Sequence, residues 1–151
     1  MAKIYLGGDH AAFPLKEKIK EYLKRDLGYE VEDKGAFNFD GFDDYPDYIK
    51  PVARAVASDP GNNRGIVMGG SGQGEAIVAN RFKGVRTAVF YGGPEEIIKL
   101  SREHNDANIL SIGARFVSEN DIMRAVKLWL ETPFSGEERH KRRIAKIDEE
   151  N

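Results

Sequence analysis

The sequence contains no cysteine, no long hydrophobic run and no excess of one charge sign. Without cysteine the chain has no disulfides, no thiolate metal ligands and no thiolate base, so its acid–base chemistry depends on other side chains. Nowhere do 18 apolar residues follow one another, and the first ten residues lack the apolar core of a signal peptide. We therefore expect a cytoplasmic protein that does not act on a membrane.

The charges are balanced, because 23 lysines and arginines are mixed with 25 acidic residues and the net charge is −2. This balance lacks the basic footprint of a nucleic-acid-binding protein. A chain of 151 residues has the size of one domain with a substantial core. We predict a single domain over residues 1–151, with a small molecule rather than a nucleic acid as its partner.

Strand-like and helix-like segments alternate along the chain. The apolar strand-like runs cover residues 3–8, 29–33, 65–69, 86–90 and 109–112, and the helix-like segments cover 14–27, 46–57, 74–81, 94–103 and 119–130. This alternation predicts an α/β fold with about five parallel strands flanked by helices. Pro133 ends the alternation, and a last helix is predicted from about 135 to 149.

Residues 65–80 combine a short apolar strand, a glycine-rich turn and a helix that carries the carboxylate of Glu75. Four glycines leave the backbone N–H groups of the turn unshielded, namely Gly69, Gly70, Gly72 and Gly74. The positive end of the following helix adds to them, so the turn can hold a phosphate or an oxyanion. A plain strand-to-helix turn is the alternative interpretation.

Three better-known loops do not fit this turn. The glycines do not continue at the offsets of the dinucleotide fingerprint, and no Lys-Ser/Thr pair follows as in a P-loop. Gln73 stands where Gly-x-Ser-x-Gly requires its last glycine. A mononucleotide-binding module on a flavodoxin-like sheet is therefore a weaker alternative.

Polar residues gather where the predicted strands end. Open parallel sheets bind ligands at the carboxyl ends of their strands, where Asp9, His10 and the glycine-rich turn are expected. Asp9 is an acid that could set the tautomer of His10, although most lone histidines have structural roles. His104 and Asn105 precede the last strand, so they are expected at the opposite edge and could reach this pocket only through a neighbouring subunit.

A basic run occupies residues 139–143. Arg139 and Arg143 are four positions apart, so they share one face of a helix and together suit a phosphate. A solvated basic surface is the alternative interpretation of this run.

Together these motifs resemble the type B ribose-5-phosphate isomerase family, which also includes galactose-6-phosphate and allose-6-phosphate isomerases. The resemblance covers nearly the whole chain and rests on Asp9-His10-Ala11, Asp44-Tyr45-Pro46, the loop and helix from Gly69 to Asn80, His104-Asn105, Arg115, and Arg139-His140 with Arg143. It implies a Rossmann-like three-layer α/β/α sandwich with strand order 2-1-3-5-4. It also implies a homodimer or dimer of dimers, with active sites built from both subunits and completed by the C-terminal helix.

The reaction that the resemblance implies is the interconversion of ribose 5-phosphate and ribulose 5-phosphate through a cis-enediolate. The family needs no metal or other cofactor, and the sequence shows no histidine–carboxylate spacing typical of a metal site. Another sugar phosphate, such as a tetrose, allose or galactose phosphate, is an open alternative. A non-catalytic sugar-phosphate-binding subunit is another.

One departure from the family concerns the base. Many members carry a cysteine just after the third strand, where this sequence has Gly69. A second branch uses a glutamate in the helix after the loop, and Glu75 matches that pattern, although the helix dipole also explains an acid in a first turn. Burial would raise the pKa of Glu75 and the helix N-terminus would lower it, so both directions are open.

The resemblance also assigns roles to individual residues. Those with catalytic roles are Glu75, His104, Asp44 and Ser71, and those that bind substrate are Asp9, His10, Tyr45, Gly70, Gly72, Gly74, Asn105, Arg115, Arg139, His140 and Arg143. Glu75 moves the proton between C2 and C1, and the amides of the turn stabilise the enediolate. His104 assists ring opening with Asp44 or Tyr45 nearby. Asn105 and Asp9 hold sugar hydroxyls, and the phosphate is bound by His10 and the arginines.

Overall fold

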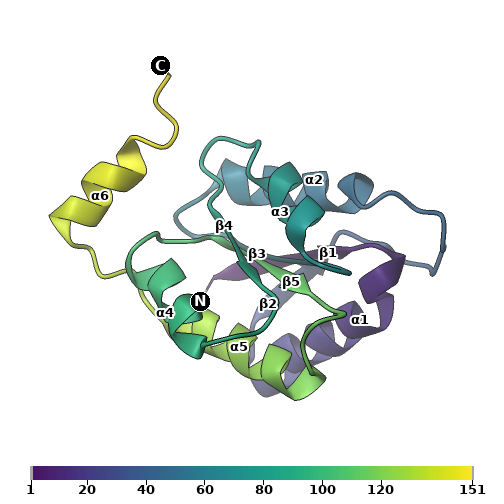
Figure 1. Ribbon diagram of the computed structural model, residues 1–151. Coiled ribbons are helices and arrows are strands. Elements are labelled where there is room, and N and C mark those ends of the chain that lie inside the picture. Colours follow the sequence, from purple (N-terminus) through teal and green to yellow (C-terminus); the bar gives the residue numbers. More distant parts are fainter. Residues whose placement is uncertain (1, 151) are drawn as a thin grey trace.

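The computed structural model describes residues 2–150 and contains a five-stranded sheet (Figure 1). The strands are β1 (Lys3–Gly8), β2 (Glu30–Asp33), β3 (Arg64–Gly69), β4 (Thr87–Phe90) and β5 (Ile109–Gly113). Every neighbouring pair is parallel, and the strand order is β2-β1-β3-β5-β4. The predicted α/β class, the parallel sheet and the strand order are confirmed.

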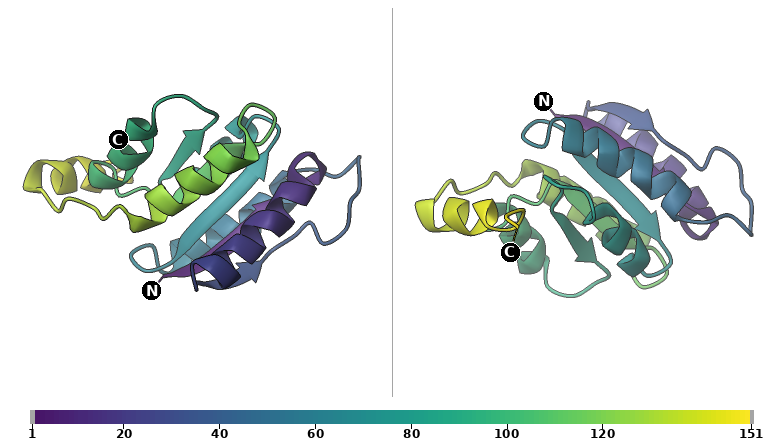
Figure 2. Two further views of the ribbon diagram at one scale, coloured as in Figure 1. Left: turned by 90° about the horizontal axis from the view of Figure 1, so that it is seen from below. Right: turned by 90° about the horizontal axis from the view of Figure 1, so that it is seen from above.

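Helices cover both faces of the sheet (Figure 2). One face carries α1 (Phe13–Glu21), α4 (Glu95–Glu103) and α5 (Glu119–Glu131), and the other carries α2 (Pro46–Ser58) and α3 (Gln73–Ala79). A short 3₁₀ turn, η1 (His10–Ala12), precedes α1, and a π-helical turn, η2 (Tyr22–Asp26), extends it. These layers form the predicted three-layer sandwich. Within residues 2–150, no helix combines the length and hydrophobicity needed to cross a bilayer.

The core follows the alternation of side chains along the central strand β3. Ile66 and Met68 pack with Trp129 in the layer of α1, α4 and α5, whereas Val67 packs with Val52 in the layer of α2 and α3. All five side chains are fully buried. A strand that is buried on both faces has a continuous apolar sequence, which is why its position is predictable.

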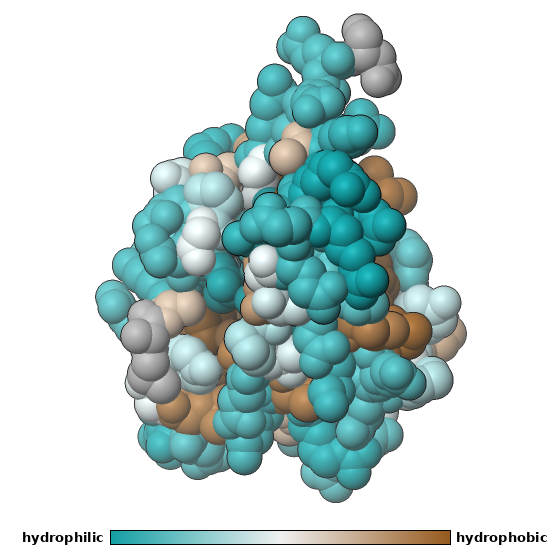
Figure 3. All heavy atoms as spheres, turned by 90° about the vertical axis from the view of Figure 1, so that its left-hand side faces the viewer, coloured by the Kyte–Doolittle hydropathy of each residue, from teal (hydrophilic) through white to brown (hydrophobic). Residues whose placement is uncertain are grey.

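The last helix is shorter than predicted. α6 spans Glu138–Ala145 instead of 135–149. Gly136 has a φ of +73° just before it, and beyond it Asp148 turns back to accept a hydrogen bond from Gly84 N–H at 2.9 Å. Both features interrupt a helical conformation. α6 projects from the rest of the chain as a mainly hydrophilic segment (Figure 1, Figure 3).

The parallel strands place two sets of loops at opposite edges of the sheet. Gly8, Gly69 and Gly113 end β1, β3 and β5 at the carboxyl edge. The segment between α4 and β5 lies at the amino edge. The two groups of predicted site residues therefore have different positions in the fold.

Candidate active site

The side chain of Glu75 lies against the last residue of β3. It belongs to the first turn of α3 and is only 5% exposed. A Cβ atom on Gly69 would lie 1.4 Å from its Oε1, so only glycine leaves room for this carboxylate. Burial raises the pKa of Glu75, a hydrogen bond from its own backbone N–H opposes the rise, and the charge of Asp9 adds to it. A carboxylate with a raised pKa is a stronger base, which suits it to proton abstraction.

The glycine-rich turn is held in one conformation. Gly72 is the N-cap of α3 and has a φ of +77°, in the left-handed region that favours glycine. Its carbonyl accepts a hydrogen bond from Ser111 Oγ of β5 at 2.7 Å. Ser71 is exposed, and its Oγ accepts a hydrogen bond from Gln73 N–H at 3.3 Å. The backbone of the turn is therefore fixed before any ligand arrives.

Two more predicted residues lie over this turn. The guanidinium of Arg115 approaches Gly70 so closely that a Cβ atom there would be 3.1 Å from Nη1. The ring of Tyr45, at the start of α2, approaches Gly74 in the same way, at 2.7 Å. Asp44 precedes Tyr45 and is exposed. The structure thus brings these residues to the edge that carries the buried carboxylate.

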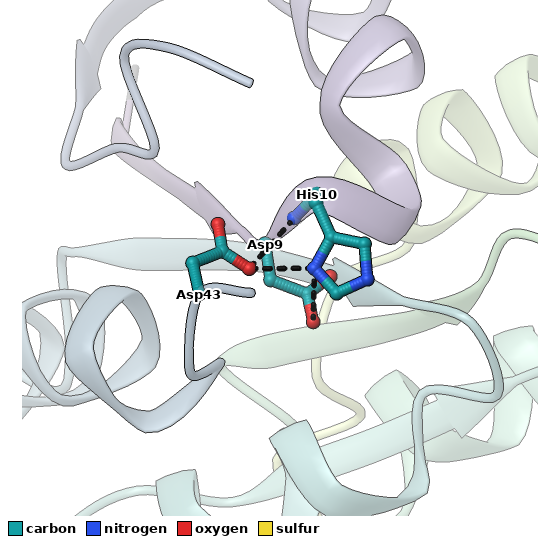
Figure 4. A group of neighbouring side chains, drawn as sticks. All are labelled: Asp9, His10 and Asp43. Carbon is teal, nitrogen blue, oxygen red and sulfur yellow. Dashed lines mark hydrogen bonds and ion pairs between the residues drawn. The ribbon is translucent and has the colours of Figure 1, made fainter. Parts of the chain in front are cut away.

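Asp9 and His10 follow β1 at the same edge, but His10 is paired differently from the prediction (Figure 4). Asp9 Oδ1 accepts a hydrogen bond from Ala11 N–H at 3.1 Å, and its Oδ2 is 4.0 Å from His10 Nδ1. Asp43 lies closer, with its Oδ1 2.6 Å from His10 Nδ1 and 3.2 Å from the His10 backbone nitrogen. The prediction that Asp9 sets the tautomer of His10 is therefore wrong, because Asp43 makes that contact.

Asp43 is not identifiable as a site residue from the sequence. It stands 33 positions after His10, in the loop between β2 and α2, so no local spacing links the two. The available signal is a group of acidic residues just before Pro46, in a loop that starts at the carboxyl edge. The hydrogen bond to Asp43 raises the pKa of His10 against the opposing effect of burial.

Asp9, His10 and Asp43 also bring three potential metal-ligand atoms within 4.8 Å of one another, although their spacing in the sequence does not predict a metal site. The 2.6 Å between His10 Nδ1 and Asp43 Oδ1 has the length of a hydrogen bond. Ligand atoms around a tetrahedral zinc ion lie farther apart, at about 3.3 Å for bonds of about 2 Å. We therefore interpret the cluster as a hydrogen-bonded pair with Asp9 beside it.

A second group of predicted residues gathers near the amino edge. His104 follows the last turn of α4, and its ring stacks on that of His140, with 4.3 Å between the centroids and 20° between the planes. Burial lowers the pKa of His140, and His104 and Arg139 beside it lower it further. Arg139 Nε lies 3.0 Å from Glu137 Oε2. Arg143 is exposed on the same helix.

Asn105 belongs to this second group. It lines a cavity of about 460 Å³ together with Arg86, Thr87 and Ser101, and its carbonyl accepts a hydrogen bond from Arg86 Nε at 3.1 Å. The cavity lies where β4 begins, at the edge opposite the buried carboxylate. The predicted assignment to opposite edges is confirmed. The resemblance implies that His104 lies near Asp44 or Tyr45. Within one chain these residues are at opposite edges of the sheet and are not neighbours.

Comparisons with known proteins show which family the chain belongs to. A sequence model described as ribose/galactose isomerase matches residues 4–147. The ribose-5-phosphate isomerase B of Mycobacterium tuberculosis is 42% identical over 142 residues, which cover 94% of this chain and 85% of that protein. A crystal structure of ribose-5-phosphate isomerase B from Mycoplasma genitalium with bound ribulose 5-phosphate has a TM-score of 0.90 and 37% identity, covering 96% of this chain and 93% of that chain.

A ribose 5-phosphate isomerase structure from Thermotoga maritima gives a similar result. Its TM-score is 0.88 and its identity 43%, and the match covers 97% of each chain. The match of the family model over most of the sequence, joined to these relatives, leads to one conclusion: the chain belongs to the ribose/galactose isomerase family.

Proposed function

We propose that the protein interconverts ribose 5-phosphate and ribulose 5-phosphate through a cis-enediolate. The observation that carries the proposal is the buried carboxylate of Glu75, placed beside a fixed turn of glycines. The names of the relatives from M. tuberculosis and M. genitalium support the reaction, and the second of these structures holds ribulose 5-phosphate. Both relatives match more than nine-tenths of this chain.

In the proposed mechanism, Glu75 removes the proton from C2 and returns it to C1. The raised pKa of Glu75, caused first by burial, favours both steps, because the carboxyl group must accept and then release the same proton. Backbone N–H groups between Gly70 and Gly74, together with Ser71, stabilise the negative charge on the enediolate oxygen. The loss of one such donor costs other enzymes roughly 3 kcal/mol of transition-state stabilisation. No metal or other cofactor takes part in these steps.

The proposed enzyme is a homodimer or a dimer of dimers with shared active sites. The reason is geometric, because the second group of predicted residues lies at the opposite edge from Glu75. A neighbouring copy supplies His104 for ring opening, beside Asp44 or Tyr45 of the first copy. It also supplies the remaining substrate contacts at the sugar hydroxyls and the phosphate, namely Asn105, Arg139, His140 and Arg143. Asp9, His10 and Arg115 bind substrate from the first copy.

A hexose phosphate is the second candidate substrate, because the matching family is described by galactose as well as ribose. The reaction at C1 and C2 is the same for either sugar, so the site chemistry above applies to both. The two candidates differ in the length of the chain between the reacting carbons and the phosphate.

The test is an NMR assay of the purified protein in D₂O with ribose 5-phosphate and a panel of tetrose and hexose phosphates. We expect ribulose 5-phosphate to form. It should contain deuterium from the solvent, because the proton held by the base exchanges with D₂O before it is returned to the sugar. The variant Glu75→Gln should lose measurable isomerisation and bind ribulose 5-phosphate within a few-fold of the wild type, because the phosphate end is unchanged.

Glu96→Gln is the matched control for this assay. Glu96 is also in the first turn of a helix, α4, but it is exposed, so this variant should keep wild-type turnover. Normal turnover by Glu75→Gln would remove Glu75 from the role of base. Turnover of a hexose phosphate without turnover of ribose 5-phosphate would replace the first candidate by the second.

A further inference from the structure

Asp43 makes contacts that the proposed reaction does not account for. Its side chain is only 4% exposed, although it belongs to a loop. Its Oδ1 accepts hydrogen bonds from both the backbone N–H and the ring nitrogen Nδ1 of His10. Among residues 2–150 its Oδ2 is buried without a hydrogen-bond partner. Burying a carboxylate costs free energy of folding. We therefore ask what function the two hydrogen bonds from His10 to Asp43 have.

We propose that Asp43 is a positioning residue that holds His10 as an imidazolium, with its Nε2–H directed at the phosphate of the substrate. This inference rests on the proposed function, because it concerns recognition of the phosphorylated end of the sugar. Asp43 itself does not touch the substrate. It acts through the ring of His10, whose charge and orientation it fixes.

The geometry supports the orientation. Two contacts to one carboxylate oxygen tie down both the backbone and the ring of His10, so the ring has little freedom about its side-chain bonds. Nε2 lies on the side of the ring that faces away from Asp43 (Figure 4). The ring of Phe39 meets the imidazole edge to face, with 6.2 Å between the centroids. A ring clamped in this way presents one N–H in a constant direction.

The charges around His10 support the protonation state. The groups that act on it are the carboxylates of Asp43 and Asp9 and, against them, the guanidinium of Arg115. The hydrogen bond to Asp43 is the largest of the effects that raise the pKa of His10. With Nδ1–H donated to Asp43, a second proton on Nε2 makes a charge-assisted hydrogen bond to a phosphate oxygen.

Asp9 does not make the same hydrogen bonds to His10. Its Oδ1 is occupied by Ala11 N–H, and its Oδ2 lies 4.0 Å from His10 Nδ1, which is too far for a hydrogen bond. The two carboxylates beside His10 therefore have separate tasks. Asp43 sets the state of the ring, and Asp9 is left to bind the sugar.

The first test measures the pKa of His10 directly in the full-length protein. The NMR signals of the ring are followed against pH in the wild type and in Asp43→Asn, and His10→Gln identifies them by their loss. The amide of this variant keeps the shape of the carboxylate and loses its charge, so the pKa of His10 should fall by about one unit or more. Asp40→Asn removes a charge from the exposed part of the same loop and should leave the titration unchanged. An unchanged titration in Asp43→Asn would overturn the proposal.

The second test uses binding and kinetics. Asp43→Asn should weaken binding of inorganic phosphate and raise KM for ribose 5-phosphate roughly tenfold near pH 8, with kcat within about twofold. The defect should shrink as the pH falls towards 6, where solvent protons charge His10 without Asp43. In a His10→Gln background the same substitution should add little, because its effect passes through the ring. A defect that persists at low pH, or that is fully additive to His10→Gln, would show a structural role instead.

These tests separate the inference from the proposed function. If the wild type does not isomerise any sugar phosphate, but Asp43→Asn still lowers the pKa of His10 and weakens phosphate binding, the proposed function fails and the role of Asp43 stands. If isomerisation is normal and both variants of the loop behave alike, the role of Asp43 fails and the proposed function stands.

Discussion

The missing side chain of Gly69 provides the space that the Glu75 carboxylate occupies. A methyl group at this position would overlap with Oε1, which would lie 1.4 Å from it, and with Cδ, at 2.3 Å. The neighbouring strand and turn hold this region rigidly, so the carboxylate would have to move rather than the backbone. The position of the proposed base therefore depends on a residue that takes no part in the chemistry.

Replacing Gly69 by alanine should displace the Glu75 carboxylate and lower kcat. A misplacement of about 1 Å costs an enzyme roughly 100-fold, and we expect a decrease of that order. KM should change only a few-fold, since the residues proposed to bind phosphate are untouched. The measurement is steady-state kinetics beside Gly41→Ala, where an added Cβ has nothing within 4 Å. Equal kcat values for the two variants would show that the contact with Gly69 does not position Glu75.

The proximity of residues within one stretch of chain was predictable, whereas the partner of His10 was not. The turn and Glu75 are contiguous in the sequence, so their proximity follows from a strand, a turn and a helix in succession. Asp9 is adjacent to His10, which made it the obvious partner. Asp43 reaches His10 only because the loop after β2 folds back over the carboxyl edge, and that path is not encoded in any local pattern.

Among the helices, α6 has the least support from the rest of the chain. Of its eight residues only His140 is buried, and an isolated helix of this length is not stable in water. The ring of His140 stacks on that of His104, which joins α6 to the end of α4. Two neutral imidazoles can stack. A positive charge on His140 would be repelled by the positive charges of Arg139 and Arg143 on the same helix.

Acidification should therefore release α6. Burial lowers the pKa of His140 in the folded chain, so the stability from its docking is present above the unfolded value of about 6.5 and is lost as the pH falls through the folded pKa. We expect amide hydrogen exchange in α6, corrected for intrinsic rates, to accelerate between about pH 7.5 and 5.5 relative to α5. His140→Gln should remove this dependence. Equal protection of α6 at both pH values would contradict the expectation.

The strands were easier to predict than the end of α6. The three central strands β1, β3 and β5 are mainly apolar runs that the sheet buries, and each ends in a glycine. The edge strand β2 is more polar and only partly buried. The basic and acidic residues of 135–149 are helix formers without such boundaries, apart from Gly136. The turn after Ala145 depends on the hydrogen bond between Asp148 and Gly84, a tertiary contact that helix propensity does not contain.

The whole molecule has its proposed site residues at two edges that one chain cannot join. The α/β class and the strand order follow from the alternation and the family resemblance, and both are confirmed. The assembly of two copies is a proposal. Its reason is that both the sequence and the structure place the proposed site residues at two opposite edges of the sheet. Its test therefore has to be made on mixtures of subunits.

Mixed dimers of Glu75→Gln and Arg143→Ala chains should regain activity that neither variant has alone. In the proposed dimer each mixed pair has one site with both residues intact, so random exchange should restore about a quarter of wild-type activity. Arg142→Ala should have little effect on activity by itself, because the side chain of Arg142 points roughly 100° away from that of Arg143 on the helix. Absence of recovery, in dimers shown by mass spectrometry to have exchanged subunits, would place both residues in one chain's own site.

The crowding between positions 69 and 75 also has an evolutionary consequence. A cysteine at position 69 and a glutamate at position 75 cannot both keep their side chains in this backbone, because the Cβ atom of the first would occupy the place of the second's carboxylate. A lineage that exchanged one base for the other through single substitutions would pass through an ancestor with a crowded base or with none. With Glu75 as the proposed base, moving that role to a cysteine at position 69 therefore takes two coordinated changes.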